Sequence, residues 1–314
     1  MELETKLKLE DIAVSSNIAE LISDTDLSKI GHDVVQNFEK DLTSRDAWEK
    51  RTEESMKLAL QVAEQKSFPW PNASNIKFPL ITIAALQYHA RSYPVLVNGD
   101  TPVKCRVIGE DDPQSSKANR ALRIESHMSY QIMEEDEDWE SETDKVLITQ
   151  PIIGCAFKKT YYDPIKKHNI SENILAKDLV VNYWTKSLET APRITHILLF
   201  QKNDIYERVI RGMWLDVSKE PREAVLNSSE GLSALQDKAQ GTNAPETTDS
   251  TTPYEILEQH CYIDFDQDGY AEPYIVFVRR DTKAVARIVP RFLPSSIEYN
   301  KKGEVPVSYT HLRA

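Results

Sequence analysis

Apolar residues recur at helical spacing among many charged positions in residues 24–65. The first series consists of Leu27, Ile30, Val34 and Phe38, and the second of Trp48, Met56, Leu60 and Val62. This period predicts two amphipathic helices. A break is expected near Thr43-Ser44, where Ser44 or Asp46 is suited to cap the second helix.

Three further helices are predicted in the first half of the chain. Residues 80–93 are strongly apolar, follow a proline and end at another, so a core helix is expected there. Residues 115–134 repeat apolar side chains at helical spacing. A further, shorter helix is expected at residues 139–148, closed by Pro151 and Gly154.

The pattern changes from helical to extended after residue 154. Residues 155–162 are rich in aromatic and β-branched side chains, which favours a strand. Further strands are predicted at 179–183 and 194–201, followed by a helix to about Arg211 that Asn203 or Asp204 caps. An antiparallel meander is predicted from three more segments: residues 254–265, 274–280 and 284–290.

These elements predict an α+β fold, with a helical N-terminal half packed on a mainly antiparallel β region. Five parts are expected along the chain. They are a partly disordered N-terminal arm (1–23), a helical part (24–154), a mixed, mainly β part (155–305), a mobile loop within it (228–252), and a non-native tail (306–314). The loop is predicted from its polar composition. The tail resembles a translated sequencing adaptor.

The net charge argues against a protein that grips nucleic acid. The chain has 38 Lys and Arg against 50 Asp and Glu, a formal charge of −12. Proteins that grip DNA cluster basic residues against phosphates, whereas this chain repels a duplex on average. A conduit in which DNA must slide benefits from that repulsion. No apolar run suits a bilayer and no secretory signal is recognised, so a cytoplasmic protein without a membrane partner is expected.

Little in the sequence points to catalysis. Seven histidines show no metal-ligand spacing, and nine glycines form no phosphate loop or nucleophile elbow. We therefore expect no catalytic residue, and the acidic run 134–138 is interpreted as a solvated helix junction. Lys158 and Lys159 alternate along a strand, so they do not form one nucleic-acid patch. Cys105, Cys155 and Cys261 have no paired spacing and are expected to be reduced.

The sharpest local motif is the acidic turn at residues 264–272. Asp264, Asp266 and Asp268 alternate before Gly269, like the start of an EF-hand calcium loop. Tyr270 and Glu272 occupy later ligand positions of such a loop. Ile275, however, stands where an EF-hand has its bidentate Glu, and the flanks are predicted strands. A plain acidic hairpin turn, with Gly269 at positive φ, is therefore favoured over a Ca²⁺ site.

A second motif, FPWPNASN, interrupts all periodicity at residues 68–75. Pro69 and Pro71 restrict their neighbours to extended conformations. The large apolar side chains of Phe68 and Trp70 are expected to be buried, either as a plug in the core or at a seam between subunits. Asn72 and Asn75 are assigned to the same plug or seam.

Several segments, in order, resemble the portal proteins of tailed bacteriophages, in the short-tailed branch with large subunits. The matching segments are FPWPNASNIKFPLI (68–81), HMS (127–129), DWE (138–140), DK (144–145), PIIG (151–154), KKTYYDP (158–164), DLVVNY (178–183) and RITH (193–196). The resemblance extends over about residues 40–305. It implies the outer, wing part of the subunit, with the stem helices missing.

The resemblance also implies a function and partners. Portal proteins assemble as dodecameric rings at one capsid vertex, through which DNA is packaged and ejected. The resemblance implies binding to further copies of the chain, the terminase large subunit, tail adaptors and coat or scaffold proteins. DNA would pass through the channel without sequence-specific binding. The expected location is the virion, after assembly in the host cytoplasm. Two alternatives stay open: a metal-dependent phage nuclease using the three aspartates, and a head scaffold or adaptor without a channel.

Overall fold

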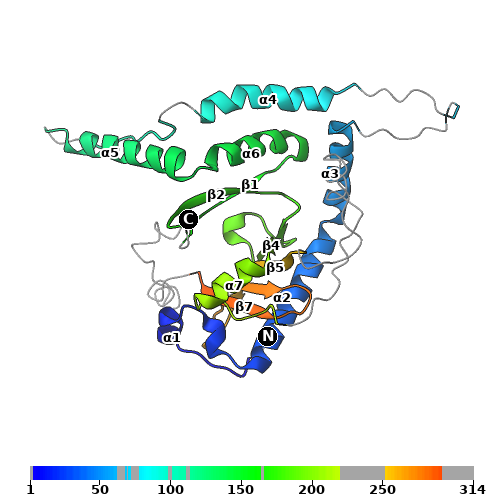
Figure 1. Ribbon diagram of the computed structural model, residues 1–314, viewed down its shortest axis with the longest axis vertical. Helices are drawn as coiled ribbons and strands as arrows, with labels where there is room; N and C mark the ends of the chain where they lie inside the picture. Colours follow the sequence, from blue (N-terminus) through cyan, green and yellow to red (C-terminus); the bar gives the residue numbers. More distant parts are fainter. Residues whose placement is uncertain are drawn as a thin grey trace. The chain divides into compact units, whose positions relative to one another are not determined.

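The protein has an α+β fold, as the sequence predicts, with helices toward the N-terminus and antiparallel sheets toward the C-terminus (Figure 1). The computed structural model describes residues 3–61, 68, 70–71, 78–97, 101–110, 114–163, 166–219 and 252–291. The predicted loop at 228–252 lies outside these residues except for Thr252, and the predicted tail at 306–314 lies outside them completely.

Helices and strands alternate little along the chain. The helices are α1 (Leu9–Val14), η1 (Ile18–Leu21), α2 (Asp24–Ser44), α3 (Asp46–Ala59), α4 (Leu80–Leu96), α5 (Ser116–Tyr130), η2 (Gln131–Glu135), α6 (Trp139–Ile153), η3 (Leu188–Thr190) and α7 (Lys202–Ile210). The strands are β1 (Phe157–Asp163), β2 (His168–Ile174), β3 (Leu179–Val181), β4 (Ile194–Phe200), β5 (Tyr254–Ile263), β6 (Glu272–Arg279) and β7 (Val285–Pro290).

The chain forms two compact units, whose boundaries differ from the one expected at residue 154. Unit 1 contains residues 1–50 and 177–313, and unit 2 contains residues 51–176. The chain leaves unit 1 within α3 and returns after the β1–β2 hairpin. The sequence does not reveal this division, because it depends on which distant segments pack together and not on where helical periodicity gives way to alternation.

Unit 1 is built on a five-stranded antiparallel sheet with strand order β3-β4-β5-β6-β7. The predicted meander is confirmed: β5 pairs with β6 and β6 with β7. Apolar clusters cover both faces. On one face Val276 and Val278 of β6 join Phe38 of α2, and on the other Phe277 packs with Trp214 and Ile205. Alternate residues of a strand point to opposite faces, so one strand serves both clusters.

The predicted break between the first two long helices is confirmed at Arg45. The Arg45 backbone N–H donates to the Leu42 carbonyl and ends α2. Its guanidinium donates to the carbonyls of Leu179 and Lys177 at 3.0 and 2.6 Å. This side chain therefore fixes the end of α2 beside β3.

The described part of the N-terminal arm, residues 3–23, packs into the core of unit 1, whereas the expected partial disorder of residues 1–23 stays a prediction. Ile12 and Ile18 are buried in the main apolar cluster of unit 1. The Asn17 side chain, fully buried, donates to the Ala286 carbonyl and accepts from the Ile288 N–H, so it satisfies backbone groups of β7. The sequence did not predict this packing, because the partners of these residues lie at the other end of the chain.

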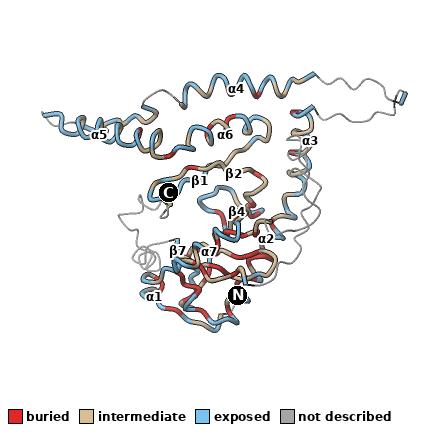
Figure 2. The backbone as a smooth tube through the Cα atoms, viewed as in Figure 1, coloured by how far each residue is buried: buried red, intermediate tan, exposed pale blue. Residues whose placement is uncertain are grey.

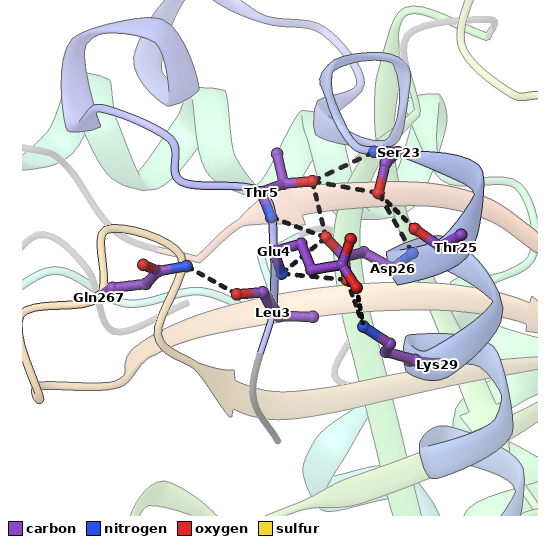
Figure 3. Close-up of polar contacts among 8 residues, drawn as sticks. All are labelled: Leu3, Glu4, Thr5, Ser23, Thr25, Asp26, Lys29 and Gln267. Carbon is purple, nitrogen blue, oxygen red and sulfur yellow. Dashed lines mark hydrogen bonds and ion pairs between the residues drawn. The ribbon is translucent and has the colours of Figure 1, made fainter.

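A carboxylate clasp fastens this arm to α2 (Figure 3). The buried Asp26 carboxylate accepts hydrogen bonds from the Glu4 and Thr5 N–H groups and from the Thr5 hydroxyl, the last at 2.7 Å. Lys29 also contacts it, at 3.1 Å. The Thr5 hydroxyl hydrogen bond, foremost, holds the pKa of Asp26 well below its ordinary value. The clasp therefore stabilises the arm near neutral pH and weakens as the pH falls toward that depressed pKa.

Unit 2 consists of α4, α5, η2 and α6 together with the β1–β2 hairpin. Two helices continue past the prolines that were expected to end them: α4 includes Pro94 and α6 includes Pro151. The first of these prolines lies in the last turn of its helix, and the second just before the final residues. Gly154, at φ +88°, ends α6 as predicted.

The β region also differs from the sequence prediction in two details. Strand β2, with the polar sequence HNISENI, was not predicted, because it lacks the apolar alternation by which strands are recognised. Helix α7 was predicted with Asn203 or Asp204 as its cap. The cap is Gln201, two residues before Asn203, and Asp204 accepts the Gln201 backbone N–H at 2.9 Å.

Candidate functional site

The acidic turn between β5 and β6 brings its three aspartates together. Carboxylate oxygens of Asp264, Asp266 and Asp268 lie within 4.8 Å of one another. Gly269 has φ +92°, as predicted for this turn, and Gln267 is also left-handed at φ +54°. Three converging carboxylates are hard oxygen ligands of the kind that Ca²⁺ takes. The sequence motif therefore corresponds to a real cluster of side chains in unit 1.

Two of the three carboxylates already act as acceptors for the backbone of their own turn. Asp264 accepts the N–H groups of Asp268 and Gly269 at 3.3 and 2.9 Å. Asp268 accepts the N–H of Tyr270 at 2.9 Å. Short acidic side chains stabilise turns in this way without any metal. The geometry therefore supports the acidic-turn interpretation at least as well as a cation site.

The other two predicted ligands behave differently from the aspartates. Glu272 is fully buried at the start of β6, paired with Ile263, and lies outside the group of three carboxylates. Tyr270 is exposed. Burial, and secondly the negative charges of Glu272 and Asp266, raise the pKa of the Tyr274 hydroxyl. Glu272 is therefore a buried residue of β6 and is not part of the group of three carboxylates in the turn.

The turn is also bound to the N-terminal arm, a contact that the sequence did not predict. The Gln267 side-chain amide donates to the Leu3 carbonyl at 2.8 Å (Figure 3). The Leu7 N–H donates to the Phe265 carbonyl at 3.0 Å. The buried ring of Phe265 packs edge-on against Tyr274. The turn therefore anchors the arm next to the clasp at Asp26.

Calcium distinguishes the two interpretations of the turn. Because Asp264 and Asp268 are occupied by backbone N–H groups, we expect millimolar Ca²⁺ to shift the melting temperature of the wild type and of Asp266→Ala equally. Differential scanning fluorimetry with Ca²⁺, and with Mg²⁺ as the matched ionic control, measures this. A Ca²⁺-specific rise in the wild type that Asp266→Ala lacks would establish a cation site, because a bound ion stabilises the folded state by mass action.

Phe68 and Trp70, the predicted plug or seam residues, are exposed. Their exposed fractions are 83% and 64%, so the core-plug interpretation is wrong for both. Burial at a seam between subunits is compatible with this exposure and stays a prediction. Asn72 and Asn75 lie outside the described residues.

Unit 2 buries few apolar side chains. Among its described residues the buried hydrophobic ones are Ala59, Ala85, Leu147, Ile174 and Ala176, whereas both large apolar clusters belong to unit 1. Figure 2 shows the same contrast: buried residues follow the sheet of unit 1, and α4 and α5 are mostly intermediate or exposed. A domain normally folds around its own apolar core. Unit 2 therefore offers apolar surface that its own chain leaves exposed.

Helix α4 was predicted to be a core helix, and this prediction is wrong. Only Ala85 of this helix is buried. Its contacts with α6 include polar ones: His89 contacts Asp144 at 2.5 Å, Tyr93 contacts Glu140, and Tyr88 donates to Gln150 at 3.3 Å. Apolar side chains are distributed around most of α4, and Leu80, Leu86 and Val95 are exposed.

The charged groups that were weighed for catalysis or DNA contact are dispersed. In the acidic run, Asp136 is buried while Glu134, Glu137 and Asp138 are exposed. Burial raises the pKa of Asp136. Lys158 lies 4.9 Å from the Trp139 ring centroid and donates to Thr143.

The cysteines have no disulfide. Burial raises the pKa of Cys261 to about 12, which keeps this thiol protonated.

A scan against protein-family models finds no match for this sequence, and a search of curated proteins finds none either. None of the described helices combines the length and the apolar character needed to cross a bilayer. The described residues thus form an α+β protein. Unit 1 has a well-packed apolar core, and unit 2 carries several exposed apolar side chains.

Proposed function

We propose that this chain is the N-terminal part of a portal protein of a tailed bacteriophage, a subunit of the ring at one vertex of the capsid. The ordered series of segments that resemble short-tailed phage portal proteins supports this assignment. In this role the chain binds further copies of itself, the terminase large subunit, tail adaptors and coat or scaffold proteins. It is located in the virion after assembly in the host cytoplasm, and it carries out no bond-making or bond-breaking.

The observation that carries the proposal is the exposure of apolar side chains on α4, in a unit that buries few apolar residues among those described. Leu80, Leu86 and Val95 are each more than half exposed. Exposed large apolar side chains on one element are typical of a surface that associates with a partner. A ring subunit requires such surface where it meets its neighbours. The net charge of −12 suits a channel that DNA must slide through.

Electron microscopy of the product of the intact gene tests this function. We expect closed rings with a central hole in negative stain, and a mass of many subunits in light scattering. A lone subunit at high concentration would contradict the proposal. Closed assemblies without a hole would favour the scaffold or adaptor alternative. Nicking of plasmid DNA with Mg²⁺ or Mn²⁺ that Asp264→Asn abolishes would favour the nuclease alternative.

A further inference from the structure

Side chains of this chain protect both edges of the five-stranded sheet in unit 1. At β7, Asn17 donates to the Ala286 carbonyl and accepts the Ile288 N–H. At β3, Arg45 donates to the Leu179 carbonyl. Open edge strands bind further strands, and proteins commonly cover them for this reason. Both edges of this sheet are therefore already engaged within the copy.

The outer edge of β2, in the hairpin of unit 2, is covered in the same way. The Asn173 N–H donates to the Glu142 carboxylate at 2.8 Å. The Asp136 carboxylate accepts the Ser171 N–H. In an antiparallel pair, residues directly opposite each other either bond to each other or both point their backbone groups outward. These two contacts therefore also give the orientation of the residues opposite, in β1.

Strand β1 has an open outer edge. Thr160 lies opposite Ser171, so its backbone N–H and carbonyl point away from β2. By alternation, those of Lys158 and Tyr162 point the same way. No described residue forms a hydrogen bond with the outward backbone groups of these three. Lysines often guard such edges, but the Lys158 ammonium is held against α6 by Thr143.

Residues 101–108, also in unit 2, have the pattern of a strand but belong to no sheet. All of them are described, and they form no helix, strand, turn or bend. Exposure alternates along the segment: the half-buried residues are Val103, Cys105 and Val107, and the exposed ones are Lys104, Arg106 and Ile108. A period of two is that of a strand with one covered face. Ile108 has an exposed fraction of 92%, although it is apolar and β-branched.

One backbone side of this segment is used within the copy, and the other is open. The Cys105 N–H donates to the Glu125 carboxylate at 3.1 Å. In an extended chain the backbone groups of successive residues point to opposite sides, so those of Arg106 and Ile108 point away from Glu125. No described residue forms a hydrogen bond with the backbone of Arg106 or Ile108. The segment therefore presents a row of backbone donors and acceptors for a further strand.

We propose that residues 101–108 of one copy add as an antiparallel third strand to β1 of a neighbouring copy, with Cys105 opposite Tyr161. An open sheet edge and a strand without a sheet are the two halves of β-strand addition, in which main-chain hydrogen bonds supply the affinity. This register joins the two open backbone rows and places no like charges opposite each other. A slip of two residues would instead place Arg106 opposite Lys158, which is unfavourable.

The donor strand comes from a second copy, because among the described strands β1 pairs with β2 alone. The donor segment and the acceptor strand are different surfaces, so the contact repeats head to tail from copy to copy. Such contacts form rings when the rotation between copies closes. This inference rests on the proposed function, which requires a ring of copies. A third strand also strengthens a two-stranded sheet, which is marginal by itself.

A disulfide across the new contact tests the proposal. The backbone groups of Tyr161 bond to β2, so its pair with Cys105 is a non-hydrogen-bonded one with Cα atoms about 4.5 Å apart, within the range of a disulfide. We expect Tyr161→Cys in the intact gene product to form a disulfide with the native Cys105 of the next copy. After mild oxidation, non-reducing electrophoresis should show dimers, trimers and larger species. Adding Cys105→Ser should abolish all of them.

Two further variants act as matched controls. Thr160→Cys places its thiol on the opposite face of β1 and should not cross-link to Cys105. In the Tyr161→Cys background, Ile108→Pro removes an N–H that the contact uses and should lower the cross-linked fraction about tenfold. Val107→Pro removes an N–H on the other side of the segment and should leave the fraction unchanged. Circular dichroism verifies that each variant folds.

Several outcomes would overturn the contact. They are cross-linking that stops at the dimer, that Thr160→Cys matches, or that persists in the variant with Cys105→Ser. Closed rings without the expected cross-links would refute this contact alone. Cross-linked species larger than a dimer, without rings, would keep the contact and refute the proposed function. Lone subunits without cross-links would refute both.

Discussion

Replacing Arg279 by Met is expected to lower the free energy of unfolding of this protein by about 3–5 kcal/mol. Arg279 is the largest fully buried side chain of the described residues, with no exposed surface. Its guanidinium donates to the Val217 carbonyl at 2.7 Å and to the Asp281 carboxylate at 2.5 Å, and it lies over the Tyr254 ring. Met fills similar volume but leaves the Asp281 charge without its cation.

Urea denaturation followed by fluorescence measures this loss, and the adjacent residue provides a matched control. Arg280 also forms an ion pair, with Glu255 at 2.8 Å, but its side chain is 30% exposed. Solvent screens such a pair, so Arg280→Met should cost roughly 1 kcal/mol or less from the lost ion pair. Arg279→Met/Asp281→Asn should recover part of the loss, because the orphaned charge is removed as well. Equal costs for the two single replacements would show that burial of the charge is not the cause.

Local periodicity was sufficient to predict most elements of this fold. The break at Arg45 and the meander of β5, β6 and β7 depend on residues close in sequence, and both are confirmed. The strands of the meander alternate buried and less buried positions, as in Val276, Phe277 and Val278. Such patterns are visible in the sequence because buried and exposed positions recur with the period of the helix or strand to which they belong.

The placement of segments could not be predicted, because it depends on partners far along the chain. The arm looked poorly ordered in sequence, yet Asn17 and Asp26 hold it by hydrogen bonds that no local pattern encodes. Helix α4 has the composition of a core helix, and composition cannot show that its neighbour α6 offers polar groups instead. Periodicity gives the face of a helix, but not the molecule against which that face packs.

The candidate sites show the same limit. The acidic turn was found from the sequence because its aspartates and Gly269 lie within six residues, and their convergence is real. The hydrogen bond between Gln267 and Leu3 was not predicted, because no sequence motif around Gln267 indicates a partner so far away in the chain.

Replacing Gly31 by Ala is the second substitution with a large expected effect, and it should destabilise the protein although Ala favours helices. Gly31 lies inside α2, where Ala would gain about 1 kcal/mol of helix propensity. A Cβ there would lie 1.9 Å from the backbone carbonyl oxygen of Lys283, in the β6–β7 turn. A backbone atom cannot swing aside as a side chain can, so α2 must move off the sheet.

The size of that movement decides the outcome. Overpacking a tight contact costs about 1–3 kcal/mol and sometimes more. Here the lost packing includes Phe38 and Ile30 of α2, which belong to the main core, so we expect a net loss of at least about 2 kcal/mol in urea denaturation. Ser28→Ala, at an exposed position of the same helix, isolates propensity and should stabilise slightly. If Gly31→Ala were as stable as Ser28→Ala, α2 would not approach the β6–β7 turn closely, and the glycine would be a helix defect without a packing reason.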